Sequence, residues 1–420
     1  MKINKFSGIL ILTIVWVFFD LSCSHKFNNP LSAKNQVPPL TPSNPNPPDL
    51  ATNQPVRLTL SWSCSDPNPS DTVTYEIYFG ASPYLNLIKT DTGSTLKLSN
   101  LGSNTLYNWR IKAIDNKGNA TEGPLWAFST GLNPWTRKAY IPTARTYGSA
   151  STINNSIYVM GGWNSSAYLS TMETYDPVAN IWSSKASMPT ERGFLAAVTI
   201  NGKIYAIGGW GPSGPLSTVE EYDPLSNSWT SKAPMPTPRY GLAVGALNNK
   251  LYAVGGWANS VALTTVEEYD PATDSWSSKA PLLTPRGFLA MGVANNKLYA
   301  IGGWNGASNL STVEEFNPQA NAWISKASMP SPRSYLAVGG LNNKLFAVGG
   351  WGGKDSLTIL NSLEAFDPIN DTWVQKTPMF TFRLGLVAEA ANNRLYAIGG
   401  GNGGGSVYSM TEEFDPTRDP

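Results

Sequence analysis

The chain has 420 residues, of which 41% are hydrophobic and only 14% charged, so it is long enough for two or three domains with substantial cores. Its formal net charge is +1 and no segment concentrates Lys or Arg, which excludes an electrostatic surface for nucleic acid. The 38 Gly, 32 Pro, 15 Trp and 18 Tyr, with few runs at helical spacing, predict an all-β protein of short strands joined by turns.

Residues 1–23 have the pattern of an export signal. Two lysines precede an apolar core at residues 9–19, which is too short to cross a bilayer as a helix. The segment ends in Leu-Ser-Cys23, which resembles a bacterial lipobox, and this resemblance implies that Cys23 is lipidated and becomes the new N-terminus. Asp20 stands where that motif has an aliphatic residue, so simple cleavage and secretion is the alternative. We therefore expect an exported protein, either secreted or attached to the bacterial cell envelope through a lipid on Cys23.

Two different segments follow the signal. Residues 24–53 are rich in Pro and Asn, which favours extended, weakly packed backbone and predicts a spacer. Residues 54–131 alternate apolar and polar side chains in short runs separated by turns, which is typical of a small β-sandwich. Within them, Leu101 followed six residues later by Tyr107 resembles the tyrosine corner of fibronectin type III domains. The resemblance implies a fibronectin type III-like domain, which we interpret as a spacer or a second interaction module.

Residues 132–420 contain an internal repeat marked by pairs of glycines. Successive pairs are separated by 47 residues four times and by 50 residues once. A repeat of this length indicates an array of small sheets, because one four-stranded unit cannot bury both of its faces and needs neighbours to stack against. The pairs begin at Gly161, Gly208, Gly255, Gly302, Gly349 and Gly399.

Each repeat runs through an arginine, the glycine pair, a Tyr-Asp-Pro segment and a tryptophan in a fixed order. This set resembles the kelch motif over the whole of residues 132–420. The resemblance implies a β-propeller, in which every repeat forms a blade of four antiparallel strands around a central channel.

The position of one tryptophan predicts how the ring closes. Trp135 lies 47 residues before Trp182 but ahead of the first glycine pair, and no tryptophan follows the last pair. We therefore expect residues 134–140 to pair with the strand that ends near Phe414, so that the front of the array completes the last blade and leaves no open sheet edge. The predicted fold is an all-β, six-bladed kelch propeller preceded by a fibronectin type III-like sandwich.

Two loops per repeat carry candidate ligand-binding residues. The residue after each glycine pair is tryptophan in five repeats and Gly401 in the last. The loop that enters each first strand carries an arginine, followed two residues later by an aromatic residue in four repeats. In kelch propellers both loops lie on one face, so the resemblance implies a crown of aromatic and guanidinium groups around the channel mouth. Its members are Trp163, Trp210, Trp257, Trp304, Trp351, Arg145, Arg192, Arg239, Arg286, Arg333, Arg383, Tyr147, Phe194, Phe288 and Tyr335.

Such a crown suits an acidic glycan or a peptide, because aromatic faces stack on sugars or apolar side chains and arginine forks bind carboxylates. Each set also has a structural interpretation. The tryptophans could pack against a neighbouring blade, and the arginines could cap backbone carbonyls, which is the role we favour for the arginines. The glycine-rich segment 399–405 predicts an open sixth sector of the rim that could admit a ligand.

Glu389 is the one acid in a predicted innermost strand, six residues after Arg383. Its carboxylate could accept a proton or neutralise the arginines, and we favour neutralisation. Kelch propellers include a copper radical oxidase and a sialic acid mutarotase. The single histidine, His25, lies in the spacer, so the propeller has no imidazole for copper or zinc or as a general base. A mutarotase needs only a carboxylate and cations, which keeps Glu389 and Arg383 as an alternative catalytic pair.

These observations together predict a monomeric, non-catalytic binding protein without a metal or cofactor. Its expected partner is a glycan or an extracellular or periplasmic protein, and its only expected membrane contact is the lipid on Cys23.

Overall fold

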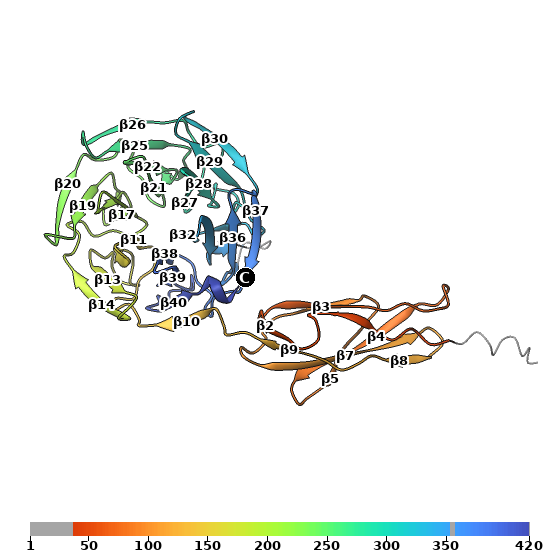
Figure 1. Cartoon of the computed structure of the whole chain (residues 1–420). Coiled ribbons are helices and arrows are strands. Elements are labelled where there is room, and N and C mark those ends of the chain that lie inside the picture. Colours follow the sequence, from red (N-terminus) through yellow and green to blue (C-terminus); the bar gives the residue numbers. More distant parts are fainter. Residues whose placement is uncertain (1–36, 353–357, 420) are drawn as a thin grey trace, which may run out of the picture. The chain divides into compact units, whose positions relative to one another are not determined.

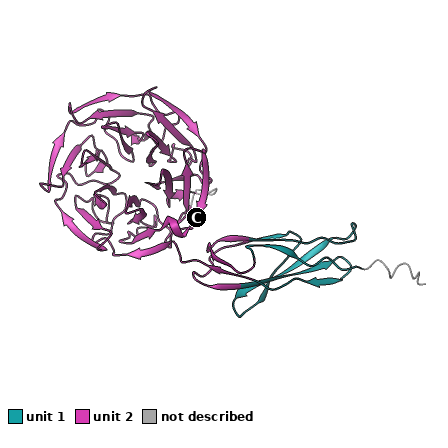
Figure 2. Ribbon diagram, viewed as in Figure 1, with its two compact units in different colours: residues 1–48, 60–96, 108–126 teal, residues 49–59, 97–107, 127–420 magenta. Residues whose placement is uncertain are grey.

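The computed structural model describes residues 37–352 and 358–419 (Figure 1). The predicted export signal, Cys23 and the first part of the predicted spacer lie outside the described residues. Among the described residues, no helix is long and apolar enough to span a membrane. By their internal contacts the described residues fall into two compact units, coloured separately in Figure 2: residues 37–48, 60–96 and 108–126 in one, and residues 49–59, 97–107, 127–352 and 358–419 in the other.

Nine strands precede the repeats in the part of the chain that the structure describes. One sheet has the order β1-β3-β6, and a second has the order β2-β9-β7-β4-β5 with β8 paired to β7. The strands are β1 (Ser43–Asn46), β2 (Ala51–Gln54), β3 (Leu58–Ser63), β4 (Val73–Ala81), β5 (Asn86–Asp91), β6 (Thr95–Leu98), β7 (Leu106–Asp115), β8 (Ala120–Glu122) and β9 (Trp126–Thr130).

Strand β7 shows the alternation expected of a strand with one buried face. It buries every second side chain, among them Trp109 and Ile111, both 0% exposed. At its start the hydroxyl oxygen of Tyr107 accepts a hydrogen bond from the backbone N–H of Gly102 at 2.6 Å. This side-chain-to-backbone hydrogen bond is of the kind that a tyrosine corner makes.

The structure differs from the sequence prediction for residues 24–53, because β1 and β2 lie within the range predicted as a spacer. Both are edge strands of four residues. Extended Pro- and Asn-rich backbone already has nearly the conformation of a strand, and an edge position tolerates the missing N–H groups of proline. The segment therefore pairs with the sandwich over part of the length that was expected to stay unpaired.

The described repeats form six antiparallel four-stranded sheets, here numbered 1 to 6. Sheet 1 holds β11 (Ser149–Ile153), β12 (Ser156–Met160), β13 (Met172–Asp176) and β14 (Ile181–Lys185). Sheet 2 holds β15 (Ala196–Ile200), β16 (Lys203–Ile207), β19 (Val219–Asp223) and β20 (Ser228–Lys232). Sheet 3 holds β21 (Ala243–Leu247), β22 (Lys250–Val254), β25 (Val266–Asp270) and β26 (Ser275–Ser278).

Sheet 4 holds β27 (Ala290–Ala294), β28 (Lys297–Ile301), β29 (Val313–Asn317) and β30 (Ala322–Lys326). Sheet 5 holds β32 (Ala337–Leu341), β33 (Lys344–Val348), β36 (Leu363–Asp367) and β37 (Thr372–Lys376). Sheet 6 holds β38 (Val387–Ala391), β39 (Arg394–Ile398), β40 (Thr411–Phe414) and, from the front of the array, β10 (Trp135–Lys138).

Short ribbons lie between the second and third strands of three sheets, and the ribbon of sheet 5 also includes β31, which precedes its first strand. They are β17 (Trp210–Gly211) with β18 (Gly214–Pro215), β23 (Trp257–Ala258) with β24 (Val261–Ala262), and β31 (Arg333–Ser334) with β34 (Trp351–Gly352) and β35 (Thr358–Ile359).

The first strands of the six sheets line a closed ring, seen in Figure 1. Each contacts the first strand of the next sheet, and β38 of sheet 6 contacts β11 of sheet 1. The second strands are buried on both faces, as a strand between two packed sheets must be; in β28 this holds from Leu298 to Ile301. The repeat region is therefore an all-β, propeller-like array.

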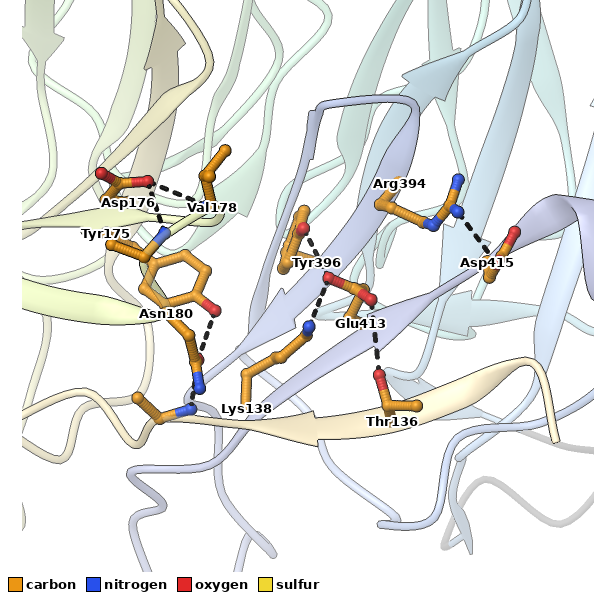
Figure 3. A network of polar contacts seen from close by, with 12 residues as sticks. Thr136, Lys138, Tyr175, Asp176, Val178, Asn180, Arg394, Tyr396, Glu413 and Asp415 are labelled. Carbon is orange, nitrogen blue, oxygen red and sulfur yellow. Dashed lines mark hydrogen bonds and ion pairs between the residues drawn. The ribbon is translucent and has the colours of Figure 1, made fainter. Parts of the chain in front are cut away.

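Sheet 6 is completed by the pairing that the position of Trp135 predicts. Strand β10 pairs antiparallel with β40, with Trp135 opposite Phe414. In Figure 3, Glu413 of β40 accepts a hydrogen bond from Thr136 and forms an ion pair with Lys138 at 3.0 Å. Trp135 is 1% exposed, and its indole N–H donates to the backbone carbonyl of Thr377 in sheet 5 at 2.8 Å. Polar and apolar contacts thus join the front of the array to its end.

The glycine pairs connect neighbouring sheets in a second closed ring. The N–H of each second glycine donates to the carbonyl of the arginine in the next sheet at 2.8–3.0 Å, and Gly400 closes the ring on Arg145. Each first glycine has φ between 57° and 64°, and a Cβ there would lie 2.5–2.7 Å from that same carbonyl oxygen. The positive φ and the close carbonyl oxygen both require glycine at this position, which explains why the glycine pair recurs in every repeat.

Candidate functional site

The six arginines of the predicted crown lie inside the sheets and not on the surface. Their exposed fractions are 0–2%, and each forms an ion pair with the glutamate on the third strand of its own sheet. The pairs are Arg145–Glu173, Arg192–Glu220, Arg239–Glu267, Arg286–Glu314, Arg333–Glu364 and Arg383–Glu412.

The guanidinium groups also bond to backbone carbonyls. Arg286 donates to Gly302, the first glycine of its sheet's pair, at 3.1 Å and to Thr312 at 3.0 Å. Burial lowers the pKa of Arg192 to about 10, against the opposing effect of Glu220, so this group is cationic at neutral pH. These contacts agree with the structural role that the sequence favoured for the arginines, which is to cap backbone carbonyls. They also fix the loop that enters the first strand.

A ring of six backbone hydrogen bonds surrounds the channel mouth. At the position two residues after each arginine, the N–H donates to the carbonyl of the same position in the preceding sheet, at 2.6–2.9 Å. All six positions have φ between 53° and 62°. They are Tyr147, Phe194, Gly241, Phe288, Tyr335 and Gly385.

The left-handed conformation costs a non-glycine residue roughly 1–2 kcal/mol, and such strain concentrates at functional sites. Four bulky aromatic residues nevertheless adopt it here. We call Tyr147, Phe194, Phe288 and Tyr335 the mouth cluster.

The rings of the mouth cluster cover the centre of the mouth as two stacked pairs. The centroids of Tyr147 and Phe194 lie 4.2 Å apart, and those of Phe288 and Tyr335 lie 4.4 Å apart. The pairs meet through Tyr147 and Tyr335 at 5.7 Å and through Phe194 and Phe288 at 6.0 Å. A Cβ at Gly241 or Gly385 would come within 2.6 Å of a neighbouring ring, so the mouth has room for only these four.

Tyr240 is an aromatic residue of the mouth that the sequence analysis missed. Its ring lies 5.8 Å from that of Phe288 and 6.0 Å from that of Phe194. The signal for it was an aromatic residue one position after Arg239, in the repeat where the usual aromatic position is Gly241.

The five tryptophans lie beside the arginine loops, as the resemblance to kelch propellers implied. The backbone of Trp163 bridges to Thr146, and the other four make the equivalent pairing in their own sheets. All five are half-buried, and some pack on the mouth aromatics, such as Trp257, whose ring stacks on Phe288 at 6.0 Å. We call Trp163, Trp210, Trp257, Trp304 and Trp351 the tryptophan collar.

The collar is interrupted in sheet 6, where two adjacent cavities of about 290 and 300 Å³ lie. Trp163 lines the first cavity and Trp351 the second, while Tyr147, Leu384 and Gly403 line both. We call the two cavities together the sixth-sector groove. A Cβ at Gly401 would lie 2.5 Å from the carbonyl oxygen of Ser406, so the local backbone excludes a sixth tryptophan.

Glu389 lies inside the central channel, a cavity of about 390 Å³ lined by the first strands. Thr152 of sheet 1 donates a hydrogen bond to its carboxylate at 2.9 Å. Burial raises the pKa of Glu389 to about 7, although the hydrogen bond from Thr152 opposes this. Arg383 contacts Glu412 and the carbonyls of Gly399 and Met410, so the contacts of the described residues do not join the alternative catalytic pair.

One acidic cluster lies outside the propeller-like array. Carboxylate oxygens of Asp66, Asp71 and Asp115 lie within 4.8 Å of one another. The ammonium group of Lys117 already pairs with Asp71 at 2.9 Å and supplies a positive charge there.

Comparison with known proteins identifies the repeat. Residues 125–282 match the KLHDC2/KLHL20/DRC7 Kelch-repeats domain, and residues 285–330 and 332–380 match the Kelch motif. The chain therefore contains kelch repeats.

Two individual proteins are also similar. The solved structure of YjhT is similar with a TM-score of 0.58 at 20% identity, over 65% of this chain and 95% of that chain, which supports the propeller-like fold of the kelch repeats. Chitinase A1 of Niallia circulans is 30% identical over 120 residues, which are 26% of this chain and 16% of the chitinase.

Proposed function

We propose that this kelch protein is an exported, envelope-anchored, non-catalytic binding protein that recognises a glycan at the mouth of a six-bladed propeller. Export and the lipid anchor rest on the sequence of residues 1–23, and a fibronectin type III-like spacer domain is supported by the hydrogen bond between Gly102 and Tyr107. The six paired sheets and their closing strand support the number of blades.

The observation that carries the proposal is the aromatic surface formed by the mouth cluster and the tryptophan collar. All nine side chains are only partly buried, and they gather on one face of the array. Aromatic faces bind the apolar faces of sugar rings, while the hydroxyls of Tyr147 and Tyr335 can exchange hydrogen bonds with sugar hydroxyls. The strained backbone beneath the mouth cluster holds four bulky rings together at one point, which is the usual association of strain with function.

A glycan array with residues 24–420 tests the proposal. Tyr335→Gly removes one ring from the mouth, and the equivalent Gly241 and Gly385 show that glycine fits this backbone. We expect this variant to lose glycan binding while its circular dichroism spectrum is unchanged. Leu225→Ser is the control, because Leu225 is 96% exposed in a turn between the third and fourth strands of sheet 2, outside the mouth. An array on which no glycan binds would contradict the proposal and favour a protein partner.

A sialic acid mutarotase-like activity is the second candidate. It is favoured by Glu389, since a carboxyl group with a pKa of about 7 can exchange protons at neutral pH. Two observations oppose this activity. Glu389 follows Gly385 of the mouth by four residues in the chain, and Arg383 is ion-paired with Glu412. Proton NMR of anomer exchange in N-acetylneuraminic acid decides: acceleration by the protein that is abolished in Glu389→Gln would establish catalysis and overturn the non-catalytic proposal.

A further inference from the structure

The sixth-sector groove lies where the tryptophan collar is interrupted, and aromatic side chains line it on both sides. Its walls are the half-buried indoles of Trp163 and Trp351, and its floor includes the rings of Tyr147 and Tyr335. The glycine-rich segment 401–407 passes between the walls with few side chains, so its backbone N–H and C=O groups lie close to the groove. Stacking surfaces and hydrogen-bonding groups therefore meet in one place.

The described residues that line the groove carry no charged group. Among its described lining residues the only ionisable groups are the hydroxyls of Tyr147 and Tyr335, and burial raises the pKa of both. They are neutral donors at physiological pH. The arginines that were candidates to bind a carboxylate are all buried against their own glutamates, and Arg383, the arginine of this sector, is 0% exposed. An acidic sugar would lose hydration at its carboxylate here without gaining a cationic partner among the described lining residues.

The size of the groove indicates more than one sugar residue. Its two cavities of about 290 and 300 Å³ each lie at the lower end of the range of small-ligand sites, and they share Tyr147, Leu384 and Gly403. A single sugar ring would fill one cavity and contact one tryptophan, whereas a linked pair would contact both.

We propose that the sixth-sector groove is the glycan subsite of this protein and that it selects a neutral oligosaccharide of at least two residues, one stacked against Trp163 and the other against Trp351. This inference rests on the proposed glycan-binding function and gives it a place and a substrate class. The crown expected from the sequence suited an acidic glycan or a peptide, whereas the burial of the six arginines favours a neutral ligand.

Isothermal titration calorimetry with four defined disaccharides tests the inference. Cellobiose and N,N′-diacetylchitobiose are the neutral probes, and a glucuronic acid-containing and a sialic acid-containing disaccharide are the acidic probes. We expect the neutral probes to bind at least about tenfold more tightly than the acidic ones, and their affinity to be unchanged between low and high salt.

Variants in pairs locate the subsite. Trp163→Ala and Trp351→Ala should each weaken binding of the better neutral probe about three- to tenfold, the usual effect of one stacked aromatic ring. Trp257→Ala is the comparison variant: Trp257 occupies the same repeat position but lines neither cavity, so its loss of affinity should be smaller than that of Trp163→Ala. Tyr147→Gly should weaken binding similarly, whereas Leu225→Ser, at a 96%-exposed turn position outside the mouth, should leave it within about twofold.

The outcomes separate this inference from the proposed function. Equal losses from Trp163→Ala and Trp257→Ala, or tighter binding of the acidic probes, would overturn the groove or its neutrality while leaving glycan binding intact. Absence of binding by all four disaccharides, together with an array without hits, would overturn both. Circular dichroism and the unfolding midpoint of each variant show whether a loss of binding comes from unfolding.

Discussion

Replacing Trp135 tests whether the ring is held closed by the front strand. Trp135 is 1% exposed, its ring lies 5.2 Å from that of Phe414, and its N–H bonds to Thr377 at 2.8 Å. Truncating a buried Trp to Ala costs about 3–5 kcal/mol through lost burial and the cavity left behind. We therefore expect Trp135→Ala to lower the free energy of unfolding of the kelch repeats by that amount. Trp135→Phe should cost about 1–3 kcal/mol, because it keeps a ring but leaves the carbonyl of Thr377 without its partner.

Urea unfolding followed by far-UV circular dichroism measures the change, with hydrogen exchange at β40 as the local readout. Trp182→Ala is the matched control, since Trp182 has the same role in sheet 1, with its N–H bonded to Ala139 at 2.9 Å, but is only half-buried. Trp182→Ala should therefore lower the free energy of unfolding by less than Trp135→Ala does. If Trp135→Ala cost less than 1 kcal/mol, or left the amides of β40 as protected as before, the closing strand would not be a stable part of sheet 6 and the reasoning would be refuted.

Three further predictions concern the closing strand, the buried ion pairs and the channel. A chain that begins at Asn133 should keep the unfolding midpoint of the kelch repeats, whereas deletion of residues 133–141 should lower it strongly; equal midpoints in thermal denaturation would contradict this. Glu267→Ala should destabilise by about 3–5 kcal/mol, because it leaves the 0%-exposed Arg239 without its ion pair, while replacing both by Met and Leu should cost far less in the same urea titration. Because the folded-state pKa of Glu389 is raised to about 7 from an ordinary 4.5, its proton stabilises the fold at low pH, and up to about 3 kcal/mol of stability should be lost as the pH rises from 4.5 to 7. Glu389→Gln should flatten this part of the stability profile, and an unchanged slope would show that the carboxyl titrates normally.

The repeat architecture could be predicted from the sequence because each conformation or contact that it requires can be supplied by only one or a few residue types. The glycine pairs recur since a positive φ and a close carbonyl from the next sheet exclude every side chain, as at Gly255, where a Cβ would lie 2.5 Å from the oxygen of Arg286. The displaced Trp135 allowed the closing strand to be predicted for a similar reason. Each sheet needs one large side chain, and the tryptophan that the last repeat lacks had to come from elsewhere in the chain.

Only part of the candidate site could be predicted from the sequence. The resemblance to kelch propellers implied which loops share a face, and it placed the tryptophans and arginines together. It did not determine that the arginines point into the sheets toward their glutamates, because the two partners of each pair lie 28 to 31 residues apart and the choice between surface and interior depends on the packing of three strands. The sequence favoured a carbonyl-capping role for the arginines but left an acidic ligand open, and only their burial in the structure shows that these cations face the sheets.

Composition and periodicity therefore determined the fold class and the position of the closing strand, since these depend on local conformation and on counting, and the kelch repeat followed from the resemblance of the repeated residues to that motif. Only the tertiary structure decided which side chains remain available to a ligand. Solvent exposure is a property of the assembled ring: the same packing that buries six arginines against their glutamates leaves Trp163 and Trp351 facing a groove where the sixth tryptophan does not fit.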